Sequence, residues 1–84
     1  MWIHTAEGEL LDLDHIEFIR VEENEDDQTF EVRAYPVAMG EPEEDLYYLL
    51  AWNHDEFSAR SSFDMVVAAM TAGANVVDLR VASS

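Results

Sequence analysis

The chain has 84 residues, enough for one small domain with a modest hydrophobic core. Nineteen Asp and Glu residues against four Arg and no lysine give a formal net charge of −15 at pH 7. This charge excludes direct binding to nucleic acid or to an anionic membrane and favours basic protein surfaces as partners. The absence of cysteine excludes a disulfide framework and Cys-based metal or redox chemistry.

The beginning of the chain, Met1–His4, lacks the basic and apolar regions of a secretory signal, so we expect a cytoplasmic protein. No linker, repeat or low-complexity segment interrupts the sequence, and residues 1–84 are predicted to form a single domain. Acidity of this degree is also expected of a protein that is only very soluble or adapted to high salt.

The first strands are predicted to be short and separated by tight turns. Trp2–Thr5 alternates, with Ile3 on one face and its neighbours on the other. Ala6–Glu9 is a turn in which Gly8 can adopt a positive φ. Leu10–Leu13 then pairs back, and Asp14–His15 is a turn that hydrogen-bonds to its own backbone.

The next predicted strand, Ile16–Glu22, carries apolar side chains on both faces, with Ile19 and Val21 on one face and Ile16, Phe18 and Arg20 on the other. A single helix cannot cover both faces of a sheet. Ile16 and Phe18, together with Trp2 of the first strand, therefore form a candidate face for a second copy in a C2 dimer.

Dense acidic segments mark two turns. Glu22–Gln28 is predicted to be a solvated hairpin loop, because so many like charges destabilise a regular ladder. Thr29–Tyr35 alternates as a strand that Pro36 ends. Gly40–Glu44 is the second acidic turn.

Seven consecutive apolar residues, Leu46–Trp52, are too few for a membrane helix, which needs ~20. The run has the length of a central strand buried on both faces, and we expect the other elements to pack around it. A helix over Pro42–Trp52 is the alternative, since proline and acidic residues favour a first helical turn.

A helix is predicted over residues 54–72. Asn53 and Glu56 form a capping box at its start, and Gly73 suits the left-handed position after its end. Its apolar stripe consists of Ala59, Phe63, Val66, Val67 and Met70. Val76–Val81 is predicted to be a final strand.

These elements predict an α+β fold, in which a mostly antiparallel sheet of about five strands packs against one helix that is followed by a short strand. A pleckstrin-like partial barrel capped by the helix is the alternative architecture.

Short motifs occur along most of the chain. They are W-I-x-T at Trp2–Thr5, G-E-L at Gly8–Leu10, L-D-H-I-x-x-I at Leu13–Ile19, V-x-A-Y at Val32–Tyr35, Y-L-L-A at Tyr48–Ala51, A-R-x-x-F-D at Ala59–Asp64 and V-V-D-L at Val76–Leu79. Together these motifs resemble a widespread group of small bacterial and phage domains of unknown function. The resemblance implies a strand meander with one helix and supports a strand at Leu46–Trp52. It implies no activity and no site, and this chain departs from the group in the insertion Pro36–Pro42.

No set of residues in the sequence predicts catalysis, a metal site or a cofactor. Asp12, Asp14 and His15 offer metal-ligand atoms without a fourth ligand at a known spacing, so a solvated turn is favoured. His54–Glu56 could supply a general base, but no nucleophile or Gly-rich loop accompanies it, and a capping role is favoured.

The charge therefore leads the functional prediction. Carboxylates at i and i+2 of a strand stand ~6.7 Å apart on one face, and Glu7/Glu9, Asp12/Asp14 and Glu23/Glu25 have this sequence spacing. Such rows predict a non-catalytic module that occupies a basic surface, such as the channel of a nucleic-acid-binding protein, as an immunity protein or a phage anti-defence (anti-CRISPR) inhibitor does. The acids expected to form this surface are Glu7, Glu9, Asp12, Asp14, Glu22, Glu23, Glu25, Asp26, Asp27, Glu43 and Glu44. The alternative is a homo-oligomeric structural domain whose acidity serves only solubility or salt adaptation.

Overall fold

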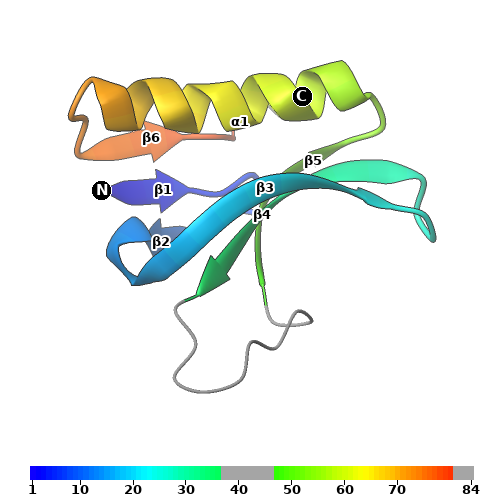
Figure 1. Cartoon of the computed structure of the whole chain (residues 1–84), viewed down its shortest axis with the longest axis horizontal. Helices are drawn as coiled ribbons and strands as arrows, with labels where there is room; N and C mark the ends of the chain where they lie inside the picture. Colours follow the sequence, from blue (N-terminus) through cyan, green and yellow to red (C-terminus); the bar gives the residue numbers. More distant parts are fainter. Residues whose placement is uncertain (37–46, 81–84) are drawn as a thin grey trace.

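The computed structural model describes residues 1–36 and 47–80, and these residues form an α+β fold with six strands and one α-helix (Figure 1). The elements in chain order are β1 (Trp2–His4), β2 (Leu10–Asp12), the short 3-10 helix η1 (Leu13–His15), β3 (Ile16–Asn24), β4 (Thr29–Pro36), β5 (Tyr48–Asn53), α1 (Glu56–Thr71) and β6 (Val76–Asp78).

The strands form two sheets, so the predicted single sheet of about five strands is wrong. The first sheet has the order β2-β1-β6, with β1 antiparallel to β2 and parallel to β6. The second sheet is the antiparallel meander β3-β4-β5. The chain leaves the first sheet at η1, where the Asp12 side chain accepts a hydrogen bond from Asp14 N at 3.0 Å. This bond stabilises the turn predicted at Asp14–His15.

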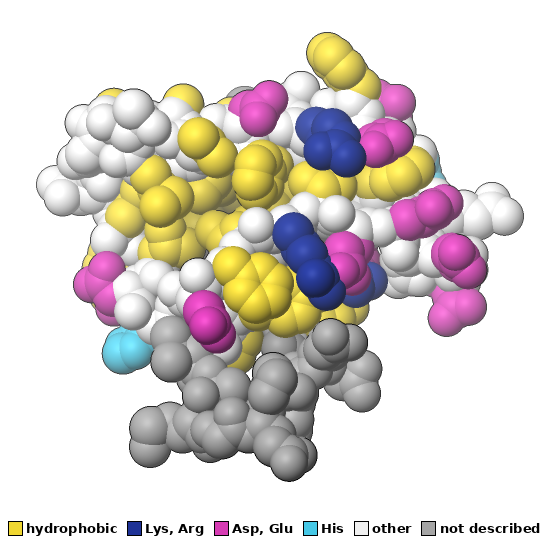
Figure 2. Space-filling model, viewed as in Figure 1, with side chains coloured by type: hydrophobic (Ala, Val, Ile, Leu, Met, Phe, Trp, Pro, Cys, Tyr) yellow, Lys and Arg dark blue, Asp and Glu magenta, His cyan; other side chains and the backbone are white. Residues whose placement is uncertain are grey.

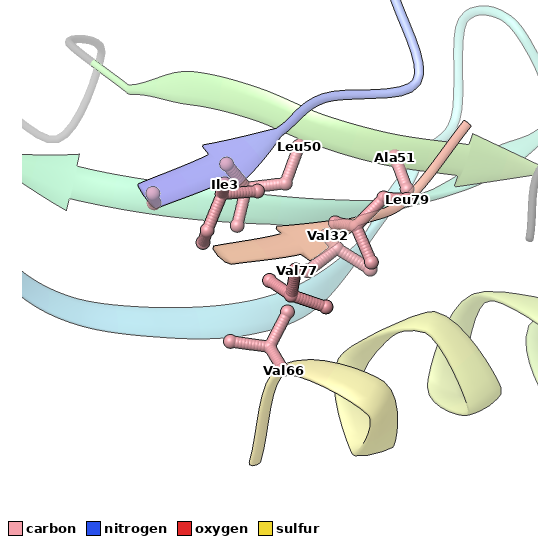
Figure 3. Close-up of a cluster of buried hydrophobic side chains, with 8 residues drawn as sticks. Ile3, Val32, Leu50, Ala51, Val66, Val77 and Leu79 are labelled. Atoms are coloured by element: carbon pink, nitrogen blue, oxygen red, sulfur yellow. The ribbon is translucent and has the colours of Figure 1, made fainter. Parts of the chain in front are cut away.

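The two sheets and α1 enclose one hydrophobic core. Figure 3 shows Ile3 and Val77 of the first sheet, Val32 and Leu50 of the second sheet, and Val66 of α1 directed toward one another. The sheets are also joined by a backbone bond of 2.8 Å from Ala6 N to Leu50 O.

The strand predicted around residues 46–52 is confirmed as β5, Tyr48–Asn53, although its predicted central position is wrong. It lies at an edge of the second sheet, and both Tyr48 and Trp52 are exposed. The central strand is β4, in which Thr29, Glu31, Val32, Ala34 and Tyr35 are buried. Residues 42–46 of the helical alternative lie outside the described residues.

A β-bulge between Ile16 and Phe18 changes the predicted faces of β3. Ile16 packs against the core together with Ile19 and Val21, whereas it was expected to share a face with Phe18. The extra residue of a bulge reverses which side chains point to which face in the part of the strand that precedes it. The sequence contains no pattern that predicts this reversal.

The helix is confirmed, but its cap and its stripe differ from the prediction. Asp55 is the N-cap and accepts a bond from Ser58 N at 3.1 Å, whereas Asn53 accepts one from Asp55 N. Ala59 and Val66 of the expected stripe are buried and Phe63 packs against the core, but Val67 and Met70 remain exposed. No helix within the described residues has the length and apolarity to cross a bilayer.

Candidate binding site

The end of β3 and the turn of the β3–β4 hairpin expose four acids. Asn24 holds this turn, because its side-chain oxygen accepts bonds from the backbone N–H groups of Asp26 at 3.1 Å and Asp27 at 3.3 Å. Gln28 then adopts a positive φ of 55° and leads into β4. The exposed acids, here called the hairpin tip, are Glu23, Glu25, Asp26 and Asp27.

The β1–β2 turn places Glu7 on the surface close to the end of β5. The turn is closed by bonds from Thr5 N to Glu9 O at 2.7 Å and from Gly8 N to Thr5 O at 3.0 Å, and Gly8 has a φ of 91°. The indole N–H of Trp52 donates to the Glu7 carboxylate at 3.3 Å. Glu7 therefore lies beside an exposed aromatic ring of the second sheet.

Glu7 and the hairpin tip meet at one open hollow of about 460 Å³. We call this hollow the acidic corner, and its lining residues are Glu7, Asp27, Thr29, Glu31, Leu49, Trp52 and His54. The rings of Trp52 and His54 meet edge to face with centroids 5.7 Å apart. Segments far apart in the sequence thus bring carboxylates and one exposed indole together.

The middle of the hairpin holds a second, more buried group of charges. Glu31 is only 6% exposed and accepts hydrogen bonds from Arg33 at 2.8 Å and Asn24 at 3.3 Å. Arg33 also bonds Glu22 of β3 at 2.5 Å, and Arg20 pairs with the same Glu22. We call Glu22, Glu31, Arg20 and Arg33 the hairpin network.

Aromatic rings cover the hairpin network. The Arg33 guanidinium lies 4.3 Å from the Tyr47 ring centroid, and that of Arg20 lies 4.7 Å from Tyr35. Burial lowers the pKa of Arg33, but hydrogen bonds to Tyr35 and Glu31 and the charge of Glu31 outweigh it, so the pKa is raised. The Arg33 side chain therefore keeps its positive charge within the network.

All four arginines of the chain pair with carboxylates of the same chain. Arg20 and Arg33 belong to the hairpin network, Arg60 pairs with Glu56 at 3.1 Å, and Arg80 pairs with Asp78 at 2.8 Å. Because the sequence contains no lysine, the acids outside these pairs dominate the surface. Figure 2 shows Asp and Glu side chains gathered at the hairpin end of the molecule, on the right.

The predicted acids do not form the regular rows expected from the sequence. Glu7 and Glu9 lie in a turn, Asp14 lies in η1 and Glu25 lies in the hairpin turn, so none of the three i, i+2 pairs occupies a single strand. Glu22 forms an ion pair with Arg20. Asp12 and Asp14 lie at η1, where the Asp14 carboxylate is 3.7 Å from the Met1 amino group. Glu43 and Glu44 lie outside the described residues.

The three residues of the candidate dimer face are not presented together. Trp2 lies on the first sheet, Phe18 lies on the second sheet and stacks on Tyr35 with centroids 4.6 Å apart, and Ile16 packs against the core.

The structure gives Asp12, Asp14 and His15 local roles in the turn. His15 is exposed and its imidazole lies 3.9 Å from the Asp12 carboxylate that caps η1. Within residues 1–36 and 47–80, no group of three or more His, Asp or Glu side chains is placed to hold a metal ion.

The burial of Glu31 and the exposure of Trp52 differ from what the sequence predicts. A usable signal existed, because Arg20 and Arg33 are two of only four cations and lie on paired strands, each two residues from a glutamate. The register places Arg20 opposite Arg33 and Glu22 opposite Glu31, so the ion pairs run along strands and across one diagonal.

Comparison of the chain with protein-family models, with curated proteins and with solved structures gave no match.

Proposed function

We propose that this chain is a non-catalytic binding protein whose acidic corner and hairpin tip dock on a basic surface of a partner protein. The observation that carries the proposal is the division of charge within the chain. Every arginine is paired internally, whereas Glu7 and the acids of the hairpin tip have no cationic partner among the described residues. These carboxylates attract basic proteins and speed their association.

Trp52 supplies the apolar anchor that an electrostatic surface alone lacks. Its side chain is 39% exposed, and its indole N–H is fixed by Glu7. An arginine or lysine of a partner that enters the hollow meets an aromatic face and the carboxylates of Glu7 and Asp27 together. Binding energy in protein interfaces concentrates at aromatic anchors of this kind, and cations bind favourably over indole rings.

The finer form of the proposal is a partner that itself binds nucleic acid. Consecutive carboxylates at the hairpin tip form a dense negative surface, and a channel built for phosphates is positively charged. In this form the chain acts as an inhibitor of the immunity or phage anti-defence kind, anti-CRISPR proteins included. The support for this form is charge alone.

The test compares two charge reversals of equal size. Asp27→Lys changes the acidic corner, and Asp64→Lys changes an exposed position on α1. Host proteins retained by the wild type at physiological ionic strength are expected to be basic, to elute with salt, and to be lost with Asp27→Lys and with Trp52→Ala but kept with Asp64→Lys. Equal retention by both reversals contradicts the proposal, as does the capture of no basic protein.

Exposed apolar residues on the first sheet favour a second candidate, the homo-oligomeric domain. The register places Trp2 beside Val76 and His4 beside Leu10, so Trp2, Val76 and Leu10 share the outer face, and all three are exposed. Asp78 on this face is paired with Arg80, which reduces the repulsion between two copies. Light scattering in the micromolar range that gives a strict monomer excludes this candidate, and a dimer broken by Trp2→Ser supports it.

A further inference from the structure

Helix α1 does not cover the core face of the whole second sheet. A helix with its side chains is ~10 Å wide and neighbouring strands lie ~4.8 Å apart, so one helix covers about two strands. In this fold α1 packs mainly over β4 and β5. The side chains of Ile16, Ile19 and Val21 on the core face of β3 therefore remain only partly buried.

An apolar groove lies between β3 and α1. Its volume is about 460 Å³, within the range of binding pockets. The residues that line it are Met1, Leu13, Asp14, Ile16, Glu17, Phe18 and Ile19 on the strand side, and Phe63, Val66, Val67, Met70 and Ala74 on the helix side. Figure 2 shows hydrophobic side chains gathered between α1, at the top, and β3.

The helix side of the groove carries no charge. Residues 65–77 are all uncharged, in a chain in which 27% of the residues are charged. Val67 is 45% and Met70 is 54% exposed, and both line the groove. The apolar stripe of α1 is therefore wider than the core requires, and its exposed part faces the groove. Contiguous apolar surface of this kind marks an interaction site.

The β-bulge of β3 brings one acid to the strand side of the groove. The register shifts between Ile16 and Phe18, so Glu17 is the extra residue of the bulge. Glu17 is exposed, lines the groove and has no cationic partner within residues 1–36 and 47–80. The other acid of the lining, Asp14, lies 3.7 Å from the Met1 amino group. Glu17 therefore supplies the uncompensated charge of the groove.

The same bulge favours a helix over an added strand as the occupant. Strand addition needs a regular row of backbone groups, and the bulge interrupts that row where β3 borders the groove. A helix packs through its side chains, at an axis distance of about 8–10 Å from a neighbouring helix. Residues 63–70 of the helix side span roughly 10 Å, which matches two turns of a docked helix with apolar residues at i, i+4 and i+7.

The charge of Glu17 distinguishes a partner protein from a second copy. The uncharged side of α1 would accept a second copy of itself, but all four arginines of the chain already pair with its own carboxylates. A second copy would therefore cover Glu17 without supplying a cation, and burial of an unpaired charge is costly. An Arg or Lys of a different protein removes that cost.

We propose that the groove binds an amphipathic helix of a partner protein. The apolar side chains of this helix pack on Val67 and Met70 over at least two turns, and an Arg or Lys beside its apolar face pairs with Glu17. The inference goes beyond the proposed function and does not depend on it, because no residue that lines the groove also lines the acidic corner.

The test uses three eighteen-residue helical peptides as probes, together with the isotope-labelled full chain. The first peptide has Leu at i, i+4, i+7 and i+11, Lys at i+1 and i+8, and Ala or Gln elsewhere, so that Lys flanks one apolar face. The second has the same residues in an order that distributes Leu around the helix. The third replaces both Lys by Gln.

Matched protein variants locate the binding. Met70→Gln removes apolar surface from the groove, and Met65→Gln makes the same change at an exposed position of α1 that does not line it. Glu17→Gln removes the charge of the groove, and Glu25→Gln removes a charge at the hairpin tip. We expect the first peptide to bind about tenfold more tightly than the second, and to be weakened about fivefold by Met70→Gln and about threefold by Glu17→Gln. The two control variants should bind it as the wild type does, and the third peptide should not respond to Glu17→Gln.

The outcomes separate this inference from the proposed function. Equal affinity for the first two peptides, or amide shifts confined to the hairpin tip and Trp52, overturns it and leaves the acidic corner as the binding surface. A bound peptide that gains no helical signal in circular dichroism also overturns it. Shifts at Val67 that grow with protein concentration in the absence of peptide mean that a second copy fills the groove, which overturns the assignment of a partner. Binding of the first peptide that survives Asp27→Lys and is weakened by Met70→Gln supports it, whether or not the acidic corner retains host proteins.

Discussion

The middle and the tip of the β3–β4 hairpin both contain acidic residues but use them differently. In the middle, Glu22 and Glu31 are held by Arg33 between aromatic rings, and Glu31 is buried. At the tip, Glu25 and Asp26 are exposed and have no cationic partner among the described residues. The acids that pair with arginine therefore stabilise the fold, whereas the acids without an arginine partner remain available for binding.

The largest expected effect is in the middle of the hairpin. Arg33→Ala leaves Glu31 buried without a cation and should lower the free energy of unfolding by about 3–5 kcal/mol, because an uncompensated buried charge is strongly destabilising. Urea denaturation followed by circular dichroism measures this loss. Arg60→Ala, which breaks an exposed i, i+4 pair with Glu56, is the matched control and should cost about 0.5 kcal/mol or less.

A double variant tests the cause of that loss. Glu31→Met together with Arg33→Met removes both charges, and the free energy of unfolding should then fall by much less than in Arg33→Ala. If the double variant is as unstable as Arg33→Ala, the loss in the free energy of unfolding comes from packing and not from the unpaired carboxylate of Glu31.

A smaller loss of stability is expected at Asn24, which lies between the middle of the hairpin and its tip. Asn24→Ala removes the side-chain oxygen that accepts the hydrogen bonds closing the turn, and the amide that donates to Glu31. The free energy of unfolding should fall by about 1–2 kcal/mol. The turn should also become more mobile, measured as faster amide exchange at Asp26 and Asp27. Unchanged exchange at both amides would contradict the role of Asn24 as the side chain that holds the tip.

The tip itself should tolerate reversal of charge. Asp26→Lys relieves repulsion between neighbouring carboxylates and should change the free energy of unfolding by no more than about 0.5 kcal/mol, in the stabilising direction. Thermal denaturation at low and high salt measures it. A clear destabilisation would show that the tip acids serve the fold.

The smallest effect concerns a carboxylate outside the hairpin. Hydrogen bonds from Arg80 lower the pKa of Asp78 from 3.8 to about 2. Because the folded pKa is lowered, the interaction stabilises fully above about pH 4 and is lost as the pH falls toward 2. An NMR titration should show Asp78 titrating near pH 2, and in Arg80→Ala near its ordinary value. An ordinary pKa in the wild type would contradict this pair.

The sequence predicted local structure better than it predicted how elements associate. Gly8 and the strand around Leu50 were correctly interpreted, because turn chemistry and apolar runs act over a few residues. The parallel pairing of β1 with β6 joins residues more than 70 positions apart, which carry no local signal of contact in the sequence. The bulge beside Ile16 similarly reassigns side chains that simple alternation had placed on the wrong face.

The candidate site was predicted only as a set of charges. Glu7 and Asp27 were named, but their meeting at Trp52 requires the two sheets to be joined at Ala6 and Leu50. The ion pair of Glu22 with Arg20 is local to β3, whereas its second pair, with Arg33, follows from strand register, which the sequence does not reveal. Charge can be counted from a sequence, whereas its compensation depends on the tertiary structure.

The parallel pairing of β1 with β6 also has a consequence for biogenesis. Trp2 lies opposite Val76, so β1 is completed on one side by a strand that is synthesised after all the other described elements. The β3–β4–β5 meander contains only sequential neighbours and can form on the ribosome before β6 has emerged. We therefore expect the first sheet to close after the meander, as a late step that a nascent chain ending at α1 cannot complete.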